Sequence, residues 1–150
     1  MVGYRRGCSK TNSGERGSAS LNQSIHFTVR SPLYWLYAAF AIGILLVGGL
    51  AVLMPLTASA LFGAPVKVAD GIDWVRTAGV RDIAIGLMFA AMLVLREGRT
   101  AGVLMLLVII VPVGDAFTVL STAGVTYQVF LHGVAAIFMA KLGSLLVKRS

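Results

Sequence analysis

The sequence carries little charge. Charged residues make up 13% of its 150 positions, whereas soluble domains average about 25%. Hydrophobic residues make up 57%, and the mean hydropathy is +0.86. Because a chain with so little polar surface cannot face water on every side, the composition excludes an ordinary soluble globular protein.

Cysteine, histidine and the common cofactor motifs are also scarce. The single cysteine, Cys8, excludes an intramolecular disulfide and a cysteine-based metal cluster. The two histidines, His26 and His132, cannot form a multi-histidine metal or haem site within one chain. The sequence has no glycine-rich phosphate loop, HExxH zinc motif or serine nucleophile elbow. We therefore predict a protein without a metal ion or an organic cofactor.

The first 31 residues form a polar, basic segment. It is rich in Ser, Gly and Asn, it contains one acid, Glu15, and its basic residues are Arg5, Arg6, Lys10, Arg16 and Arg30. This composition predicts a disordered tail over 1–31. An Arg-rich, Ser-rich and acid-poor start also resembles a mitochondrial presequence, although no clear amphipathic helix stands out. Whether the tail is a targeting segment therefore stays open.

Four largely apolar segments follow the tail, at about 33–54, 76–95, 101–120 and 129–147. A helix needs about 20 residues to cross a hydrocarbon core of about 30 Å, so each segment is long enough to span a bilayer. The length of the chain indicates one folded domain. The sequence thus predicts an all-α bundle of four transmembrane helices over 32–150, in contact with the lipid bilayer.

Prolines mark the ends of the first segment. Ser31 and Pro32 suit the N-cap and the first position of a helix, while Pro55 predicts a kink or an end. We expect residues 56–62 to continue as a short interfacial helix.

The second segment is the one that contains charge. Its purely apolar run, 83–95, covers only about 20 Å of helix. To span the bilayer, the helix must begin near Arg76, which places Arg81 and Asp82 inside the membrane.

The basic residues predict the orientation of the bundle. With four spans, the tail, the loop after the second span and the C-terminus share one side, and this side carries most of the Lys and Arg residues: Arg5, Arg6, Lys10, Arg16, Arg30, Arg96, Arg99, Lys148 and Arg149. Only Lys67, Arg76 and Arg81 lie towards the other side. The positive-inside rule therefore predicts that both termini are cytoplasmic. The same distribution explains the net charge of +7 without a nucleic-acid partner.

Three ionisable residues from three different spans fall near the same, extracytoplasmic ends. They are Asp82, Asp115 and His132. Ionisable groups at membrane depth cost about 2.5 to 3.5 kcal/mol at the bilayer centre and are usually paired inside a bundle. We therefore expect the three side chains to converge, with Arg81 and Arg76 as cationic partners. Two further polar residues, Tyr127 and Gln128, lie close enough in sequence to orient a substrate.

A proline precedes Asp115 in the third span. Pro112 cannot donate a hydrogen bond to the carbonyl oxygen of Val108, and Gly114 follows it. We therefore expect a distorted helix just before Asp115. Distorted helices next to a buried acid often line polar cavities in membrane proteins.

Three motifs resemble a known family. They are AGVRDIAIG at 78–86, VPVGD at 111–115 and LHGVA at 131–135. Together they resemble a family of small four-helix membrane proteins of fungi and bacteria that is catalogued as a domain of unknown function, with a general likeness to DoxX-like proteins. The resemblance covers about 33–147. It implies the four-helix fold and marks the Arg-Asp, Gly-Asp and His-Gly pairs, but it implies no activity.

Three functions remain open from the residues. The first is a membrane-embedded enzyme that opens an epoxide, cyclises or isomerises a lipophilic substrate by acid/base chemistry, with Asp115 as base, Asp82 as acid and His132 as proton relay. In this hypothesis Arg81 tunes the carboxylates, a grouping similar to that of limonene-epoxide-type hydrolases on an unrelated fold. The second is a structural or accessory protein in which these residues only fix helix packing. The third is a proton-coupled transporter subunit, which would need a homo-oligomer to enclose a path.

Overall fold

The computed structural model describes residues 29–66 and 69–149, without the side chains of residues 69 and 70. Nearly all of the basic tail predicted for 1–31 lies outside the described residues, and so does Lys67.

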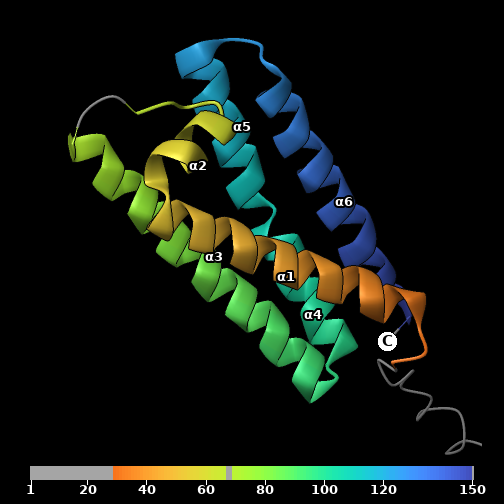
Figure 1. Cartoon of the computed structure of the whole chain (residues 1–150). Coiled ribbons are helices and arrows are strands. Elements are labelled where there is room, and N and C mark those ends of the chain that lie inside the picture. Colours follow the sequence, from red (N-terminus) through yellow and green to blue (C-terminus); the bar gives the residue numbers. More distant parts are fainter. Residues whose placement is uncertain (1–28, 67–68, 150) are drawn as a thin grey trace, which may run out of the picture.

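The described chain is helical (Figure 1). Its elements are α1 (Pro32–Leu53), α2 (Pro55–Leu61), α3 (Ala69–Leu95), α4 (Gly98–Val108), α5 (Ile110–Ala123) and α6 (Tyr127–Arg149). Four stretches are long and apolar enough to cross a membrane, and these are Pro32–Leu53, Gly71–Leu95, Gly98–Ala123 and Tyr127–Arg149. The predicted all-α fold with four transmembrane helices is confirmed.

Capping residues and prolines determine where α1 and α2 begin and end. The Ser31 hydroxyl accepts a hydrogen bond from the backbone N–H of Leu33 at 3.3 Å, and Pro32 is the first helical residue. At the other end, α1 stops at Leu53 and α2 starts at Pro55. Pro55 lacks the N–H that a continuous helix would require, which explains the break. Both predictions from the sequence are confirmed.

The third span is interrupted at Ile109, where α4 ends and α5 begins, although the backbone of Ile109 keeps helical dihedral angles (φ −53°, ψ −29°). The interruption lies within one turn of Pro112, whose missing N–H leaves the helix without one hydrogen bond. The predicted distortion is therefore present, but it lies more than a turn before Asp115 rather than directly beside it.

The second span is longer than the sequence predicted. Helix α3 begins at Ala69, not near Arg76. Its first turns are polar, and Arg76 lies 3.9 Å from Asp73 in an exposed i,i+3 ion pair that supports the helix. Hydropathy marks only the apolar part of such a helix, so it missed these turns.

The helices form two tightly packed pairs, α1 with α3 and α4–α5 with α6. Glycines bring the helices of each pair close together, since a Cβ atom at Gly48 would lie 2.7 Å from the carbonyl oxygen of Gly79. In the second pair, a Cβ atom at Gly102 would lie 2.7 Å from the carbonyl oxygen of Gly143. Towards α2 the two pairs diverge, and α2 lies between them (Figure 1).

The buried core lies in the half of the bundle that contains the start of α1 and the end of α6. It comprises Tyr37, Ala41, Ile85, Phe89, Ala101, Met105, Met139, Leu142 and Leu146. The two pairs of helices are thus joined at this end, which also brings the start of α1 close to the C-terminal end of α6 (Figure 1).

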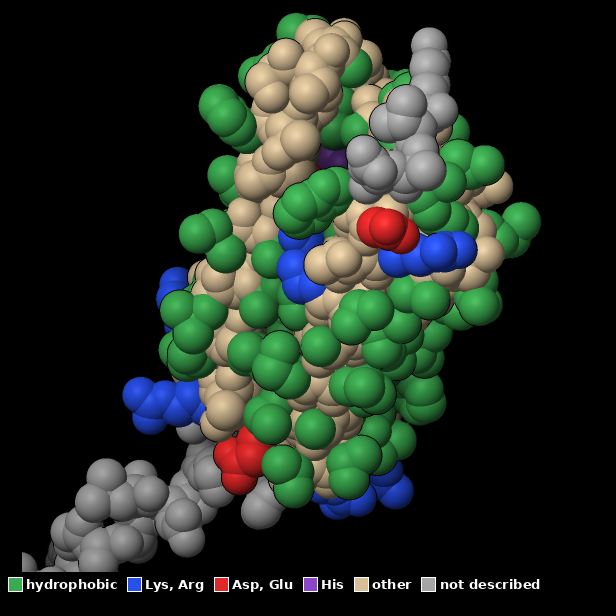
Figure 2. Space-filling model, turned by 90° about the vertical axis from the view of Figure 1, so that its left-hand side faces the viewer, with side chains coloured by type: hydrophobic (Ala, Val, Ile, Leu, Met, Phe, Trp, Pro, Cys, Tyr) green, Lys and Arg blue, Asp and Glu red, His purple; other side chains and the backbone are tan. Residues whose placement is uncertain are grey.

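Most of the outer surface is apolar. Figure 2 shows one face on which apolar side chains cover the helices between two levels of charged side chains. Large side chains that are more than half exposed occur on every span, among them Leu46, Val94, Leu107, Phe117 and Ile137. Such a surface suits contact with the hydrocarbon chains of a bilayer, and the protein is therefore a multi-pass membrane protein.

Candidate functional site

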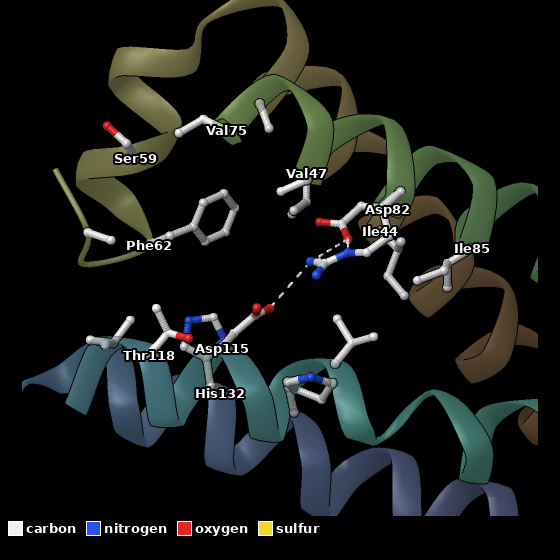
Figure 3. A pocket seen from close by; sticks show the side chains of 18 of the residues that line it. Ile44, Val47, Ser59, Phe62, Val75, Asp82, Ile85, Asp115, Thr118 and His132 are labelled. Carbon is white, nitrogen blue, oxygen red and sulfur yellow. Dashed lines mark hydrogen bonds and ion pairs between the residues drawn. The ribbon is translucent and has the colours of Figure 1, made fainter. Parts of the chain in front are cut away.

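A cavity of about 680 Å³ lies between the two pairs of helices. Its walls come from α1 and α3 on one side and from α5 and α6 on the other, and α2 with the residues after it forms one end (Figure 3). Most lining residues are apolar. The ionisable ones among the described residues are Arg81, Asp82, Asp115 and His132. The cavity therefore contains Asp82, Asp115 and His132 with one of the two predicted cationic partners, Arg81, whereas the other, Arg76, is not among its lining residues.

Arg81 is the centre of the charged group. Its Nε donates a hydrogen bond to Oδ1 of Asp82 at 3.0 Å, and its Nη2 lies 3.0 Å from the same oxygen. The same Nη2 lies 3.6 Å from Oδ2 of Asp115. Since Arg81 and Asp82 are on α3 and Asp115 is on α5, this second ion pair connects opposite walls of the cavity (Figure 3).

The two carboxylates differ in their surroundings. The Asp82 side chain is 18% exposed and that of Asp115 is 38% exposed. Asp82 also has the shorter contacts with Arg81. Asp115 is therefore the carboxylate that is more open to an incoming molecule, whereas Asp82 is held more firmly by the guanidinium group.

His132 lies on the α6 wall of the cavity and not in the ion-pair group. Its ring lies against that of Phe62, with centroids 6.4 Å apart and an angle of 33° between the planes. Within the described chain, neither Asp82 nor Asp115 is close enough to His132 for an ion pair. The imidazole thus lines the same cavity as the carboxylates.

A family model described as a domain of unknown function, DUF4267, matches residues 41–146. The chain belongs to the DUF4267 family. The matched region includes the segments 78–86, 111–115 and 131–135, so the resemblance to a family of unknown function is confirmed. The likeness of DUF4267 to DoxX-like proteins and its occurrence in fungi and bacteria stay predictions. No curated protein and no solved structure matches the chain.

Three other residues were predicted to bind substrate, and in this DUF4267 chain none of them is among the residues that line the cavity. Arg76 is paired with Asp73 on the outside of α3. Tyr127 is 62% exposed at the start of α6. Gln128 is buried instead against Gly63, where an added Cβ atom would lie 2.9 Å from its side chain. Their predicted role in substrate binding has no support from this geometry.

Several lining residues were not anticipated. Thr118 follows Asp115 by three positions and Ile85 follows Asp82 by three, so the spacing of one helical face could have identified both. Trp74 also lines the cavity. Ser59 and Phe62 reach the cavity from α2 and the turn after it. No sequence pattern indicates those two, because they depend on how α2 folds back between the helix pairs.

The ionisable residues of the DUF4267 cavity do not form a metal site. In the described part of the chain, no three His, Cys, Asp or Glu side chains are grouped so that they could hold a metal ion. Carboxylates and an imidazole can transfer protons, and a guanidinium group can stabilise negative charge.

Proposed function

We propose that this DUF4267 protein is a membrane-embedded acid/base enzyme that opens an epoxide, cyclises or isomerises a lipophilic substrate. One observation carries the proposal: Arg81 connects two carboxylates across an apolar cavity of about 680 Å³. Cavities of about 300 to 1,000 Å³ with apolar walls and a few convergent polar groups are the usual form of small-molecule sites.

The openness of the charged group favours chemistry over packing alone. Arg81, with 43% of its side chain exposed, and Asp115 both line the cavity. An exposed ion pair contributes only about 0 to 1 kcal/mol to stability, so the Arg81–Asp115 pair adds little if its single role is to join two helices.

The charge balance of the group suits an acid and a base. Two carboxylates and one guanidinium give a formal charge of −1, and a single proton shared by the carboxylates makes the group neutral, which membrane burial favours. One carboxyl group is then available as acid while the other acts as base. We assign the base to Asp115, which is more open, and the acid to Asp82.

The reaction can be written for an epoxide. Asp115 accepts a proton from a water molecule, and the water oxygen attacks a ring carbon. The carbon–oxygen bond of the ring breaks, and Asp82 donates its proton to the leaving oxygen. A proton then passes from Asp115 back to Asp82, with water and the His132 imidazole as the relay, which restores the starting state. Arg81 stabilises the negative charge that moves from one carboxylate to the other.

An Asp115→Asn variant tests the proposal. It removes the base and keeps the shape of the side chain. We expect normal abundance of the protein and a loss of about 10²- to 10⁴-fold in the rate at which the lipophilic substrate is converted, measured in lipid extracts. The matched control is Asp73→Asn, which changes the same residue type at an exposed position outside the cavity and should leave the conversion unchanged.

A structural role is the second candidate, and the Arg81–Asp115 pair between α3 and α5 favours it. This role predicts that Asp115→Asn lowers abundance and thermal stability. Unchanged conversion per folded molecule in Asp115→Asn would contradict the enzyme proposal. A pH-dependent flux in proteoliposomes without any conversion would support the transporter hypothesis instead.

A further inference from the structure

The cavity continues past the charged group into the apolar half of the bundle. Its lining there comprises Phe40, Gly43, Ile44, Ile85, Val108 and Met139, which we call the deep section. In Figure 3, Ile44 and Ile85 lie on the far side of Asp82 and Asp115 from Phe62 and Ser59. None of the six residues carries a polar side chain, so this section suits a hydrocarbon group and not a hydrophilic one.

Gly43 leaves part of the deep section empty. A Cβ atom built at Gly43 meets no other atom within 4 Å, although the residue lines the cavity. This distinguishes it from Gly48 on the same helix, where an added Cβ atom would collide with the backbone of α3. The missing side chain of Gly43 therefore enlarges the cavity and is not required for helix packing.

The charges of the site limit the ligand further. Arg81 is the single Arg or Lys among the described lining residues, and it is already paired with both carboxylates. An anionic group at this position would add negative charge beside Asp82 and Asp115 without a second Arg or Lys among the described lining residues to balance it, which is costly at membrane depth. A cationic group would compete with the proton that the proposed chemistry requires. An uncharged oxygen function meets neither obstacle.

We propose that the deep section binds the hydrocarbon part of an uncharged, long-chain lipophilic molecule whose oxygen function lies at Arg81, Asp82 and Asp115, and that Gly43 determines how much hydrocarbon fits. This inference rests on the proposed function for the reaction and adds the substrate class. It concerns binding, so it can be tested without any turnover.

Photolabelling tests the inference on the full chain in phosphatidylcholine nanodiscs. The probe is hexadecan-1-ol with a diazirine near its methyl end, and the labelled peptides are identified by mass spectrometry. Competitors are unlabelled hexadecan-1-ol, hexadecane-1-sulfonate and hexadecyltrimethylammonium. We expect competable labelling on α1 around Phe40 and Ile44 and on α6 around Met139. The alcohol should compete about tenfold better than either ion.

Gly43→Leu and Gly49→Leu form a matched pair of variants. Both positions are on α1, neither has a neighbour within 4 Å of an added Cβ atom, and only Gly43 lines the cavity. Because Leu forms helix better than Gly, neither variant should unfold. Gly43→Leu should reduce competable labelling of the deep section about tenfold or more, because the leucine side chain would occupy space that the hydrocarbon chain needs. Gly49→Leu should not change it.

Three outcomes overturn the inference: no competable labelling in the deep section, an equal effect of the two leucine variants, or better competition by either ion than by the alcohol. Conversion of a substrate in the absence of such labelling would reject this inference and leave the enzyme proposal standing. Labelling as expected, together with an unchanged rate of substrate conversion in Asp115→Asn, would support binding in the deep section and reject the enzyme proposal.

Discussion

Replacing Arg81 should destabilise the protein more than replacing either of its acidic partners. Arg81→Met leaves two carboxylates beside each other without a counter-charge, whereas Asp115→Asn leaves Arg81 paired with Asp82 at 3.0 Å. Removing one partner of a fully buried ion pair costs about 3 to 5 kcal/mol, and an exposed pair contributes about 0 to 1 kcal/mol. With side chains that are 18% to 43% exposed, we expect about 2 kcal/mol for Arg81→Met.

The assay is the free energy of unfolding in mixed micelles, measured for the single variants and for the double variant. Asp115→Asn alone should cost about 0.5 kcal/mol. The double variant Arg81→Met/Asp115→Asn should be more stable than Arg81→Met, because it removes one of the two unpaired charges. Equal costs for the two single variants, or additive costs in the double variant, would refute the view that Arg81 compensates both carboxylates.

Two further predictions concern the helices that form the cavity. Gly48→Ala should destabilise the α1–α3 pair by about 1 to 3 kcal/mol, because its Cβ atom would lie 2.7 Å from a backbone oxygen. Gly49→Ala should be neutral or stabilising in the same unfolding assay. Similar losses of stability in both variants would contradict close packing at Gly48. Arg96→Gly should raise stability by about 1 kcal/mol, since Arg96 directly follows the last residue of α3 and has a φ of 57°, a conformation that favours glycine. Unchanged or lower stability would show that this backbone conformation carries no cost.

The fold could be predicted from the sequence because the bilayer imposes simple rules. Long apolar runs identified four spans, and the chemistry of Ser31, Pro32 and Pro55 predicted where α1 begins and ends. Pro112 predicted the interruption of the third span. The start of α3 could not be found in this way. A membrane helix continues into polar residues such as Asp73 and Arg76, and hydropathy reports only the part that lipid surrounds.

The convergence of the site could also be predicted, in part. Charged groups at membrane depth need partners, and this requirement alone predicts that Arg81, Asp82 and Asp115 lie together. Closeness in sequence did not predict which side chains face the cavity, because neighbouring residues on an α-helix point about 100° apart. His132 therefore faces the cavity while Tyr127, at the start of the same helix, is exposed.

The extent of the cavity depends on tertiary packing. Phe62 reaches it only because α2 folds back between the helix pairs. The space at Gly43 is evident only from the packed structure, in which an added Cβ atom would meet no other atom within 4 Å. A glycine in an apolar span gives no sign of whether its neighbour is a helix, a lipid or an open cavity. Gly43, Gly48 and Gly49 look alike in the sequence, and their three-dimensional surroundings alone separate them.

The proposed function requires proton exchange between the carboxylates in the cavity and a lipophilic substrate. The most direct measurement is the rate of conversion per folded molecule in purified, reconstituted Asp115→Asn, compared with Asp73→Asn under the same conditions. We expect the first variant to fold normally and to lose at least about 10² in rate, while the second keeps the full rate. Equal rates in the two variants would contradict the claim.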